Sequence, residues 1–370
     1  MTEFSKFTPL VQSLPATVPF VGPETQERAA GKPFRARIGA NESGFGPAPS
    51  VKAAISAGAD EVWKYCDPEN HDLREALGAH LGLSSDRIVV GEGIDGLLGL
   101  VVRQIVTEGT PVVTSLGAYP TFNYHVAGFG GRLITVPYRD DREDLDALLM
   151  TVIRENAPLV YLANPDNPMG TWHDNKDVAA FARALPEQTM LILDEAYGET
   201  APQNALPAVS ALIDRPNVLR MRTFSKGYGL AGLRCGYAFG SPGTISSFNK
   251  VRNHFGVNKM AQIAAQAALK DQDYLTSVCG LIDASRRRIG KIARANGLEP
   301  LDSATNFVAI DCGRDGDFAT ALLQELVSRS VFVRMPGVAP LNRCIRISVG
   351  PDDMMDIFEE ELPEALKAVT

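Results

Sequence analysis

The chain is constrained most by short apolar segments that alternate with longer amphipathic segments from about residue 50 onward. The short segments, among them RIVVG, TPVVTSL and TMLIL, are rich in Val, Ile and Leu and show no regular polar alternation. Strands of this kind are buried on both faces, as in a parallel sheet that is covered by helices. The sequence therefore predicts an α/β fold with a mostly parallel sheet flanked by helices.

The pattern changes near residue 242, where a long helix-rich stretch leads into further short strands and a last helix. We therefore expect a large domain over residues 42–245 and a smaller α/β domain over residues 246–370. The start of the chain is rich in Pro, Gly and polar residues. We expect residues 1–41 to form an arm that packs on the small domain or on a partner subunit.

Composition excludes several classes of protein. The net charge of −8 has both signs interleaved, which argues against nucleic acid or an anionic membrane as the main partner. The most apolar stretch, residues 94–106, is too short to cross a bilayer and contains Arg103. Five cysteines without a CxxC pair and five scattered histidines predict neither a disulfide framework nor a metal site. The first residues lack a signal-peptide pattern, so we expect a cytoplasmic protein.

Polar residues that end apolar runs are the first candidates for a site, because ligands bind beyond the C-terminal ends of strands in open α/β sheets. Lys226 follows VLRMR and lies between hydroxyl residues and a glycine-rich run, in TFSKGYGLAGLR. An isolated lysine is usually a solvated surface charge. In this setting a lysine can form a Schiff base with an aldehyde cofactor and move the α-proton of a substrate.

Asp194 ends the apolar run TMLILD, and a carboxylate behind such a strand needs a partner. Two interpretations stay open. Asp194 can cap the N-terminus of a following helix, or it can pair with a pyridinium nitrogen. At about 4 Å and an effective dielectric constant near 20, that attraction is worth about 4 kcal/mol. It would keep the ring protonated and able to accept electrons.

Five motifs occur in an order and spacing that are similar to those of a known family. They are GANESGFGPAP (39–49), NPDNPMG (164–170), DEAY (194–197), TFSKGYGLAGLRCGY (223–237) and CIRISVG (344–350). Together they resemble the fold-type I pyridoxal-phosphate-dependent aminotransferases of class I/II, and most of all the branch that includes histidinol-phosphate aminotransferase. The resemblance runs from about Pro19 to Gly350. It implies a seven-stranded, mostly parallel sheet in the large domain and pyridoxal 5′-phosphate as the cofactor.

The resemblance also implies roles around the cofactor ring. Lys226 is similar to the lysine that holds the cofactor, and Asp194 to the carboxylate beside the pyridine nitrogen. Tyr197 and Asn167 resemble the donors to the 3′-oxygen. Tyr119 resembles the aromatic residue that stacks on the ring, with Phe122 as the nearby alternative and a place in the core as the other interpretation.

A second group of residues resembles the phosphate site of the family. The arginine of this group suits a dianion because its planar fork offers parallel donors, although a salt bridge at a helix end is the alternative. Glycines between a strand and a helix let backbone N–H groups approach a phosphate. The residues are Gly93, Ile94, Asp95, Thr223, Ser225 and Arg234. Tyr65, in KYCDP, resembles the tyrosine that reaches the cofactor phosphate of the neighbouring subunit, which implies a homodimer with shared active sites.

Three further residues resemble the substrate site. Arg346 is similar to the arginine that binds the substrate α-carboxylate, and Asn41 to a residue of the same pocket. Arg334, in FVRMP, stands where the histidinol-phosphate enzymes have a second arginine for the substrate phosphate. Phe20, in PFVGP, replaces a tyrosine of that branch and offers no hydroxyl group. The substrate therefore stays open.

The predicted function is a ping-pong transamination between an amino acid, or an amino-alcohol phosphate such as histidinol phosphate, and a 2-oxo acid. Lys226, Asp194 and Tyr197 are the expected catalytic residues. A decarboxylase or lyase on the same scaffold, similar to threonine-phosphate decarboxylase, is the alternative enzyme. A ligand-binding regulator is the non-enzymatic alternative, but the short, non-basic arm offers no DNA-binding extension.

Overall fold

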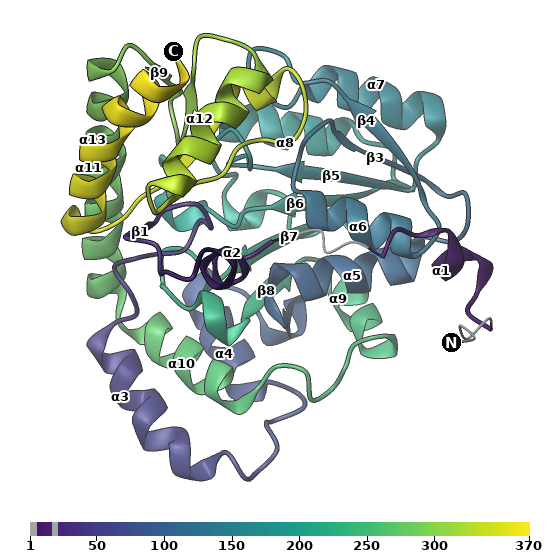
Figure 1. The fold of residues 1–370 in the computed structure, drawn as a ribbon. Helices are drawn as coiled ribbons and strands as arrows, with labels where there is room; N and C mark the ends of the chain where they lie inside the picture. Colours follow the sequence, from purple (N-terminus) through teal and green to yellow (C-terminus); the bar gives the residue numbers. More distant parts are fainter. Residues whose placement is uncertain (1–5, 17–20) are drawn as a thin grey trace.

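A seven-stranded sheet forms the centre of the computed structural model, which describes residues 6–16 and 21–370 (Figure 1). Its strands lie in the order β2-β8-β7-β6-β5-β3-β4 and run parallel, except that β8 is antiparallel to both of its neighbours. The strands are β2 (Ile88–Gly91), β3 (Pro111–Ser115), β4 (Arg132–Val136), β5 (Leu159–Ala163), β6 (Met190–Asp194), β7 (Val218–Thr223) and β8 (Gly236–Phe239). The predicted mostly parallel sheet is confirmed.

Helices cover both faces of this sheet. In β5, Leu159 and Tyr161 belong to the core on one face, while Val160 and Leu162 belong to the core on the other. Both faces are apolar, which explains why the strands show no polar alternation. The first face is covered by α5 (Gly93–Ile105), α6 (Pro120–Gly128) and α9 (Pro242–Ser247), and the second by α7 (Leu145–Glu155) and α8 (Asn175–Ala184).

A third apolar core lies at the β2 and β8 end of the sheet. There α10 (Lys259–Lys270) packs against α3 (Pro49–Gly58) and α4 (His71–Leu81). The side chain of Asn258 caps α10 by accepting the backbone N–H of Ala261. This helix follows residue 246 in the chain and still packs beside the large sheet. The expected division between residues 245 and 246 stays a proposal.

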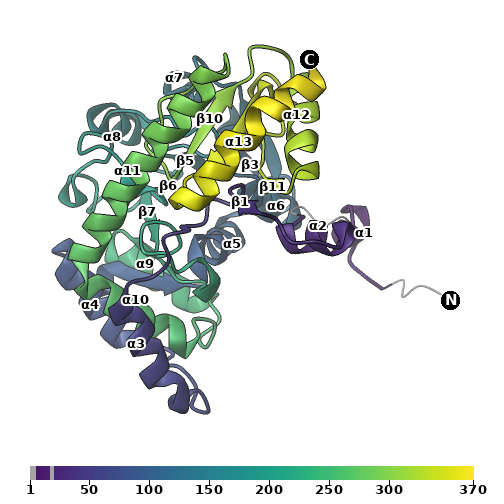
Figure 2. The same ribbon diagram turned by 60° about the vertical axis from the view of Figure 1, so that its left-hand side comes forward.

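A smaller α/β unit lies above the large sheet in Figure 1 and has its own core. It contains an antiparallel sheet in the order β12-β10-β9. Its helices α11 and α13 lie side by side in Figures 1 and 2. Its elements are β9 (Glu299–Pro300), β10 (Phe307–Asp311), β11 (Val331–Phe332), β12 (Cys344–Ser348), α11 (Gln272–Ala295), α12 (Gly316–Ser328) and α13 (Asp352–Val369).

The N-terminal arm contains two short helices that the sequence pattern did not predict, α1 (Pro9–Ser13) and α2 (Pro23–Ala30). Each begins with a proline in its first turn, where the missing N–H group costs no hydrogen bond. Helix α1 buries no residue and projects from the body of the molecule in Figure 2. After α2, the arm pairs in parallel with β11 through β1 (Ala36–Arg37).

Short 3₁₀ turns connect several elements, namely η1 (Ala59–Glu61), η2 (Ser85–Arg87), η3 (Gly198–Thr200), η4 (Val209–Ala211), η5 (Ala231–Leu233), η6 (Phe248–Lys250) and η7 (Leu341–Arg343). Within residues 6–16 and 21–370, no helix combines the length and the apolar content that a membrane crossing requires.

Candidate active site

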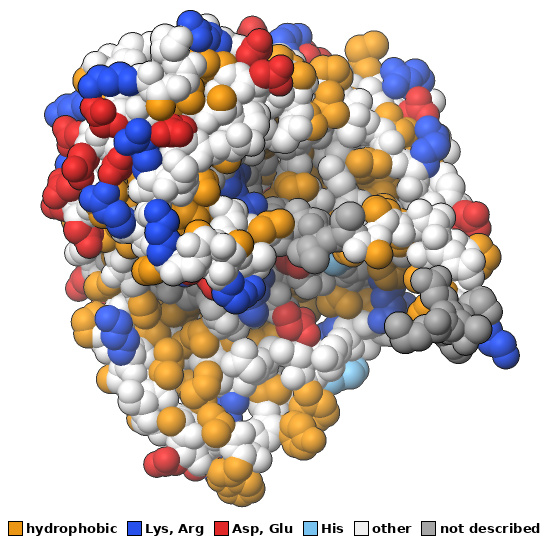
Figure 3. Space-filling view, viewed as in Figure 1, with side chains coloured by type: hydrophobic (Ala, Val, Ile, Leu, Met, Phe, Trp, Pro, Cys, Tyr) orange, Lys and Arg blue, Asp and Glu red, His pale blue; other side chains and the backbone are white. Residues whose placement is uncertain are grey.

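The C-terminal ends of β5, β6 and β7 open into a cavity of about 250 Å³. A larger cavity of about 880 Å³ shares several of its lining residues and extends toward Arg334 and Arg346. Figure 3 shows a hollow on this face of the molecule. The smaller cavity brings together ten predicted site residues, namely Ile94, Asp95, Tyr119, Asn167, Asp194, Tyr197, Thr223, Ser225, Lys226 and Arg234.

Lys226 lies just past the end of β7 and is partly buried. Its Nζ donates a hydrogen bond to the backbone oxygen of Asn41 at 2.9 Å and lies 5.5 Å from the centre of the Tyr197 ring. Burial lowers the pKa of Lys226 to about 8, and the nearby cations Arg346 and Arg234 act in the same direction. A lysine with this pKa has an appreciable neutral fraction near pH 7, and the neutral amine is the form that attacks a carbonyl group.

Asp194 ends β6 and is only 5% exposed. Its carboxylate accepts hydrogen bonds from the Tyr161 hydroxyl at 2.7 Å and from the Ala196 N–H at 2.9 Å. No α-helix begins at Asp194, so the helix-cap interpretation is wrong. Burial raises its pKa to about 6. In the described part of the chain Asp194 makes no salt bridge, which leaves its charge for a cationic group in the cavity.

Tyr197 and Asn167 each keep a donor that these hydrogen bonds do not use. The Tyr197 hydroxyl accepts the side-chain N–H of Asn41 at 3.0 Å, so its own proton is not used in that bond. Burial raises the pKa of Tyr197, which keeps the hydroxyl protonated. The side-chain oxygen of Asn167 accepts a hydrogen bond from Arg346 at 2.7 Å, and its amide N–H groups remain as donors. Both residues line the cavity that contains Lys226.

The N-terminus of α5 and the loop after β7 form an anion cradle. The backbone of Gly93 has φ +74°, and a Cβ there would lie 2.4 Å from the Arg234 guanidinium. At Gly236 a Cβ would lie 2.8 Å from the backbone nitrogen of Ile94. Glycine at these positions therefore lets Arg234 and the first turn of α5 approach the same space.

The hydroxyl groups of Thr223 and Ser225 complete this cradle and are 2.9 Å apart. Arg234 lies 3.5 Å from the Ser225 hydroxyl and makes no ion pair within the described residues, so the helix-end salt bridge is not found. The Asp95 carboxylate contacts His125 at 3.0 Å. The backbone N–H of Asp95 lies in the first turn of α5, where N–H groups have no partner within the helix. This N–H, and not the carboxylate, is therefore the group that can contact a phosphate.

Tyr119 and Phe122 have different surroundings. Tyr119 is half-buried and lines both cavities. Phe122 is fully buried in α6, where its ring stacks on Tyr161 with centroids 4.7 Å apart. Phe122 is therefore a core residue, and Tyr119 is the aromatic side chain that a ring in the cavity can meet.

Arg334 and Arg346 both line the larger cavity and are joined by an antiparallel backbone bridge. Arg346 lies over the Phe307 ring, and its only side-chain hydrogen bond in the described residues goes to Asn167. Burial lowers the pKa of Arg346 to about 10, which still leaves it charged at neutral pH. Arg334 donates to the backbone oxygen of Val21 at 2.9 Å. Two cationic groups thus face a space that opens to Lys226.

One predicted residue, Tyr65, is not brought to this site within one chain. Tyr65 is 84% exposed, lines neither cavity and packs against Phe255. Its expected contact with a neighbouring subunit stays a prediction. Phe20 lies outside the described residues.

Sequence reasoning missed residues that support the predicted ones. Tyr161 lies within an apolar strand in the sequence, but its buried hydroxyl needs a hydrogen-bond partner, and Asp194 at the end of the next strand provides one. Asn306 is fully buried and donates to the backbone oxygens of Asn41 and Glu42. No local pattern marks Asn306, because its partners lie more than 260 residues earlier in the chain.

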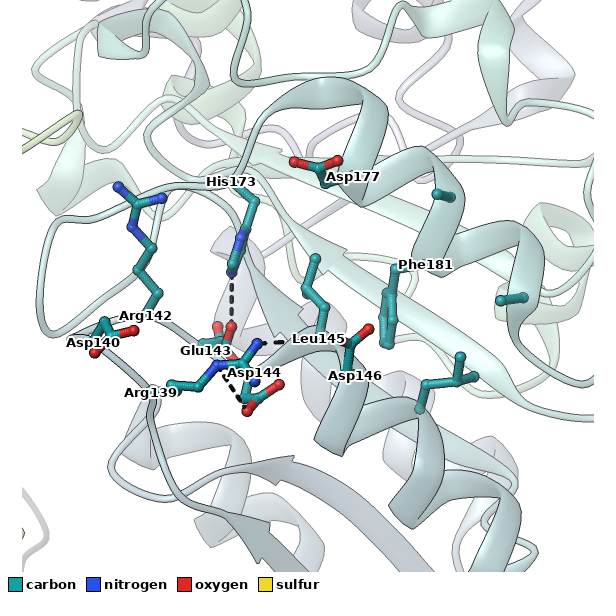
Figure 4. Close-up of a pocket in the computed structure, with 13 residues that line it drawn as sticks. Arg139, Asp140, Arg142, Glu143, Asp144, Leu145, Asp146, His173, Asp177 and Phe181 are labelled. Carbon is teal, nitrogen blue, oxygen red and sulfur yellow. Dashed lines mark hydrogen bonds and ion pairs between the residues drawn. The ribbon is translucent and has the colours of Figure 1, made fainter.

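A separate cavity of about 740 Å³ lies beside α7 and α8 (Figure 4). Several of its polar groups are paired with one another. His173 contacts the backbone oxygen of Glu143 at 2.7 Å, and Arg139 lies between Asp144 at 3.3 Å and Asp146 at 3.9 Å. In the described part of the chain it shares no lining residue with the cavities around Lys226. The candidate site is therefore the one at the strand ends.

The residues at the strand ends fit the expected cofactor. Asp194 provides a buried negative charge without a cationic partner, and the cradle at α5 provides N–H groups, hydroxyls and Arg234. Lys226 provides an amine of lowered pKa, and Tyr119 an aromatic face. A cationic ring, a phosphate and an aldehyde each find a complementary group.

Known proteins are similar to most of this chain. The family model of class I and II aminotransferases matches residues 37–362. Histidinol-phosphate aminotransferase 2 of Ralstonia nicotianae is 35% identical over 315 residues, 85% of this chain and 84% of that protein. Histidinol-phosphate aminotransferase of Moorella thermoacetica is 30% identical over 358 residues, 96% and 92% of the two chains.

A solved structure agrees with both the sequence and the fold. Histidinol-phosphate aminotransferase from Sinorhizobium meliloti, solved in complex with pyridoxal-5′-phosphate, is 63% identical over the full length of both chains, with a TM-score of 0.98. The fold class and the family that the sequence predicts agree with these relatives. The chain belongs to the class I and II aminotransferase family and is an enzyme that transfers amino groups.

Proposed function

We propose that this enzyme is a histidinol-phosphate aminotransferase that uses a 2-oxo acid as the amino acceptor. The cofactor is pyridoxal 5′-phosphate, which supplies an aldehyde that accepts the amino group and a ring that withdraws electrons from the α-carbon. The observation that carries the substrate assignment is the pair Arg334 and Arg346, which line the cavity that contains Lys226. Arg334 suits the phosphate dianion of histidinol phosphate with Arg346 beside it, and Arg346 suits the α-carboxylate of the 2-oxo acid in the other half of the reaction.

The roles of the chain's own groups follow from their positions. Lys226 binds the cofactor and, when its amine is free, takes the proton from the substrate α-carbon. Asp194 would hold a proton on the ring nitrogen. Tyr197 and Asn167 would donate to the 3′-oxygen, and Tyr119 would pack on the ring. The first turn of α5, the two hydroxyl residues and Arg234 would hold the phosphate.

We further propose a homodimer in which Tyr65 of each subunit reaches the partner's site. Four large apolar side chains are exposed on one part of the surface, namely Val62, Trp63, Tyr65 and Phe255. An exposed apolar group of this size is typical of an interface. Hydrophobic side chains gather over α3 and the segment after it in Figure 3. We also propose a cytoplasmic location, in keeping with five free cysteines.

A spectroscopic panel tests the proposed substrate. The purified, cofactor-loaded protein is mixed with histidinol phosphate, aromatic amino acids or glutamate, and loss of the visible cofactor band is followed. We expect histidinol phosphate to discharge the band with the highest kcat/KM and to yield a keto product. Equal or better use of an aromatic amino acid would contradict this substrate, and release of carbon dioxide would indicate a decarboxylase. Lys226→Ala should abolish turnover.

A further inference from the structure

We infer that Asn306 is a positioning residue for Lys226 and acts through the backbone carbonyl of Asn41. This proposal rests on the proposed function, because it concerns the stage at which the lysine amine is free of the cofactor. Lys226 must then hold its amine in one place to take and return a proton. In the structure the Lys226 amine donates to the Asn41 carbonyl, and neighbouring residues hold that carbonyl in place.

Asn41 is held in a backbone conformation that residues other than glycine adopt only occasionally. Its φ is +55°, in the left-handed region, and it is 3% exposed. Its N–H donates to the Ser348 hydroxyl at 2.9 Å, and its side-chain amide donates to Tyr197 at 3.0 Å. A conformation of this kind persists only where the surroundings determine it.

The carbonyl oxygen of Asn41 accepts two hydrogen bonds. One comes from Lys226 Nζ at 2.9 Å and the other from Asn306 Nδ2 at 3.0 Å. A carbonyl oxygen has two lone pairs, so these donors use both. Asn306 also donates to the next carbonyl, that of Glu42, at 3.1 Å. It thus fixes two successive peptide groups and the direction in which the Asn41 carbonyl points.

The two hydrogen bonds that Asn306 donates form a clamp, which comes from a part of the chain distant from Lys226. Asn306 directly precedes β10, and its own carbonyl accepts the N–H of Val349 after β12. Ser348, the other partner of Asn41, ends β12. The smaller α/β unit therefore sets the backbone that orients the amine. A base that is displaced by about 1 Å can lose roughly 100-fold in rate.

The test compares two buried asparagines that make the same kind of clamp. Asn217 donates to the backbone oxygens of Pro186 at 3.1 Å and Thr189 at 3.0 Å, directly before β7, and lines no cavity around Lys226. We expect Asn306→Leu and Asn217→Leu to lower the melting temperature by similar amounts. Asn306→Leu should reduce kcat about 10- to 100-fold with KM within about twofold, whereas Asn217→Leu should leave both unchanged.

A second readout needs no turnover. The apoprotein is mixed with pyridoxal 5′-phosphate, and the rate at which the visible band appears is measured against pH. The wild-type rate should rise with an inflection near pH 8, the pKa of the free lysine. Asn306→Leu should move the inflection to lower pH, because the ammonium form loses its fixed acceptor. Asn217→Leu should not move it.

The outcomes are separable. If Asn306→Leu loses stability but keeps the wild-type kcat and pH inflection, Asn306 is only structural and the inference is wrong. If it does not fold, Asn306→Ala removes the same donors with a smaller side chain and is judged by the same two readouts. If the wild-type apoprotein captures no cofactor at any pH, the proposed function itself fails.

Discussion

Asp194 and Glu195 are neighbours at the end of β6, and both carboxyl groups are buried, yet their surroundings are opposite. Glu195 is fully buried between two arginines, with Arg220 at 2.7 Å and Arg222 at 2.9 Å. Asp194 accepts hydrogen bonds from a tyrosine hydroxyl and a backbone N–H and makes no ion pair within the described residues. One negative charge is neutralised within the protein, and the other is left for what enters the cavity.

The difference distinguishes a structural charge from a functional one. A buried carboxylate without a cation destabilises the folded protein, because its desolvation is not offset by attraction. Burial accordingly raises the pKa of Asp194 to about 6. A buried carboxylate of this kind is expected at a functional site, where a bound cationic ligand neutralises its charge. Three substitutions test this contrast.

Removing the charge of Glu195 should have the largest effect on stability of the three substitutions. Glu195→Gln leaves Arg220 and Arg222 buried without their carboxylate, so we expect the free energy of unfolding to fall by about 3–5 kcal/mol. Denaturant unfolding of the apoprotein measures this. Glu364→Gln, which breaks an exposed pair with Lys367, should leave the midpoint unchanged. Equal effects from the two substitutions would contradict the structural role of Glu195.

Neutralising Asp194 should instead raise the free energy of unfolding of the apoprotein. Its pKa is about 6 in the folded state and about 3.9 in an unfolded chain, so the folded state binds more protons between these values. Stability therefore falls as pH rises from about 4 to about 6. Asp194→Asn should remove this fall and be more stable than wild type at pH 7, by up to about 3 kcal/mol.

The measurement is unfolding of both apoproteins by denaturant at pH 4, 5, 6 and 7. Other buried carboxyls with raised pKa values, among them Asp166 and Glu199, act in both proteins and cancel in the difference. A difference that does not change with pH would show that Asp194 is not a destabilising charge.

Removing the hydroxyl that supports Asp194 should have the smallest effect. Tyr161→Phe keeps the ring stacked on Phe122 but deletes the donor to the carboxylate. We expect the pKa of Asp194 to rise further and turnover of the loaded enzyme to fall about 10-fold, since hydrogen bonds to charged groups are worth about 1.5–3 kcal/mol. Tyr274→Phe removes hydrogen bonds to two backbone oxygens elsewhere and should leave turnover unchanged. If Tyr161→Phe keeps the wild-type turnover, the Tyr161 hydroxyl has no role at the active site.

Sequence reasoning reached the fold and the cavity because both depend on short-range patterns. Apolar strands imply a covered sheet, and the polar residues after β5, β6 and β7 must meet at one edge because these strands are parallel. This is why Asn167, Asp194 and Lys226 line one cavity.

The supporting contacts could not be read in the same way. Asn306 meets Asn41 only because the smaller α/β unit folds back over the sheet, and no residue near either one records that meeting. The sequence does not distinguish Tyr119 from Phe122, because both are aromatic and they are three positions apart. The structure distinguishes them because α6 begins directly after Tyr119 and places Phe122 in the core.

The most direct test of the contrast between Asp194 and Glu195 measures binding of two ligands to two apoproteins. Wild type and Asp194→Asn are titrated with pyridoxal 5′-phosphate and with its analogue in which a C–H group replaces the ring nitrogen. Wild type should bind the natural cofactor about 10²- to 10³-fold more tightly than the analogue, in line with an ion-pair attraction of about 4 kcal/mol. Asp194→Asn should bind the two within a few-fold of each other. The same ratio in both proteins would contradict the claim that Asp194 is a charge reserved for the ring.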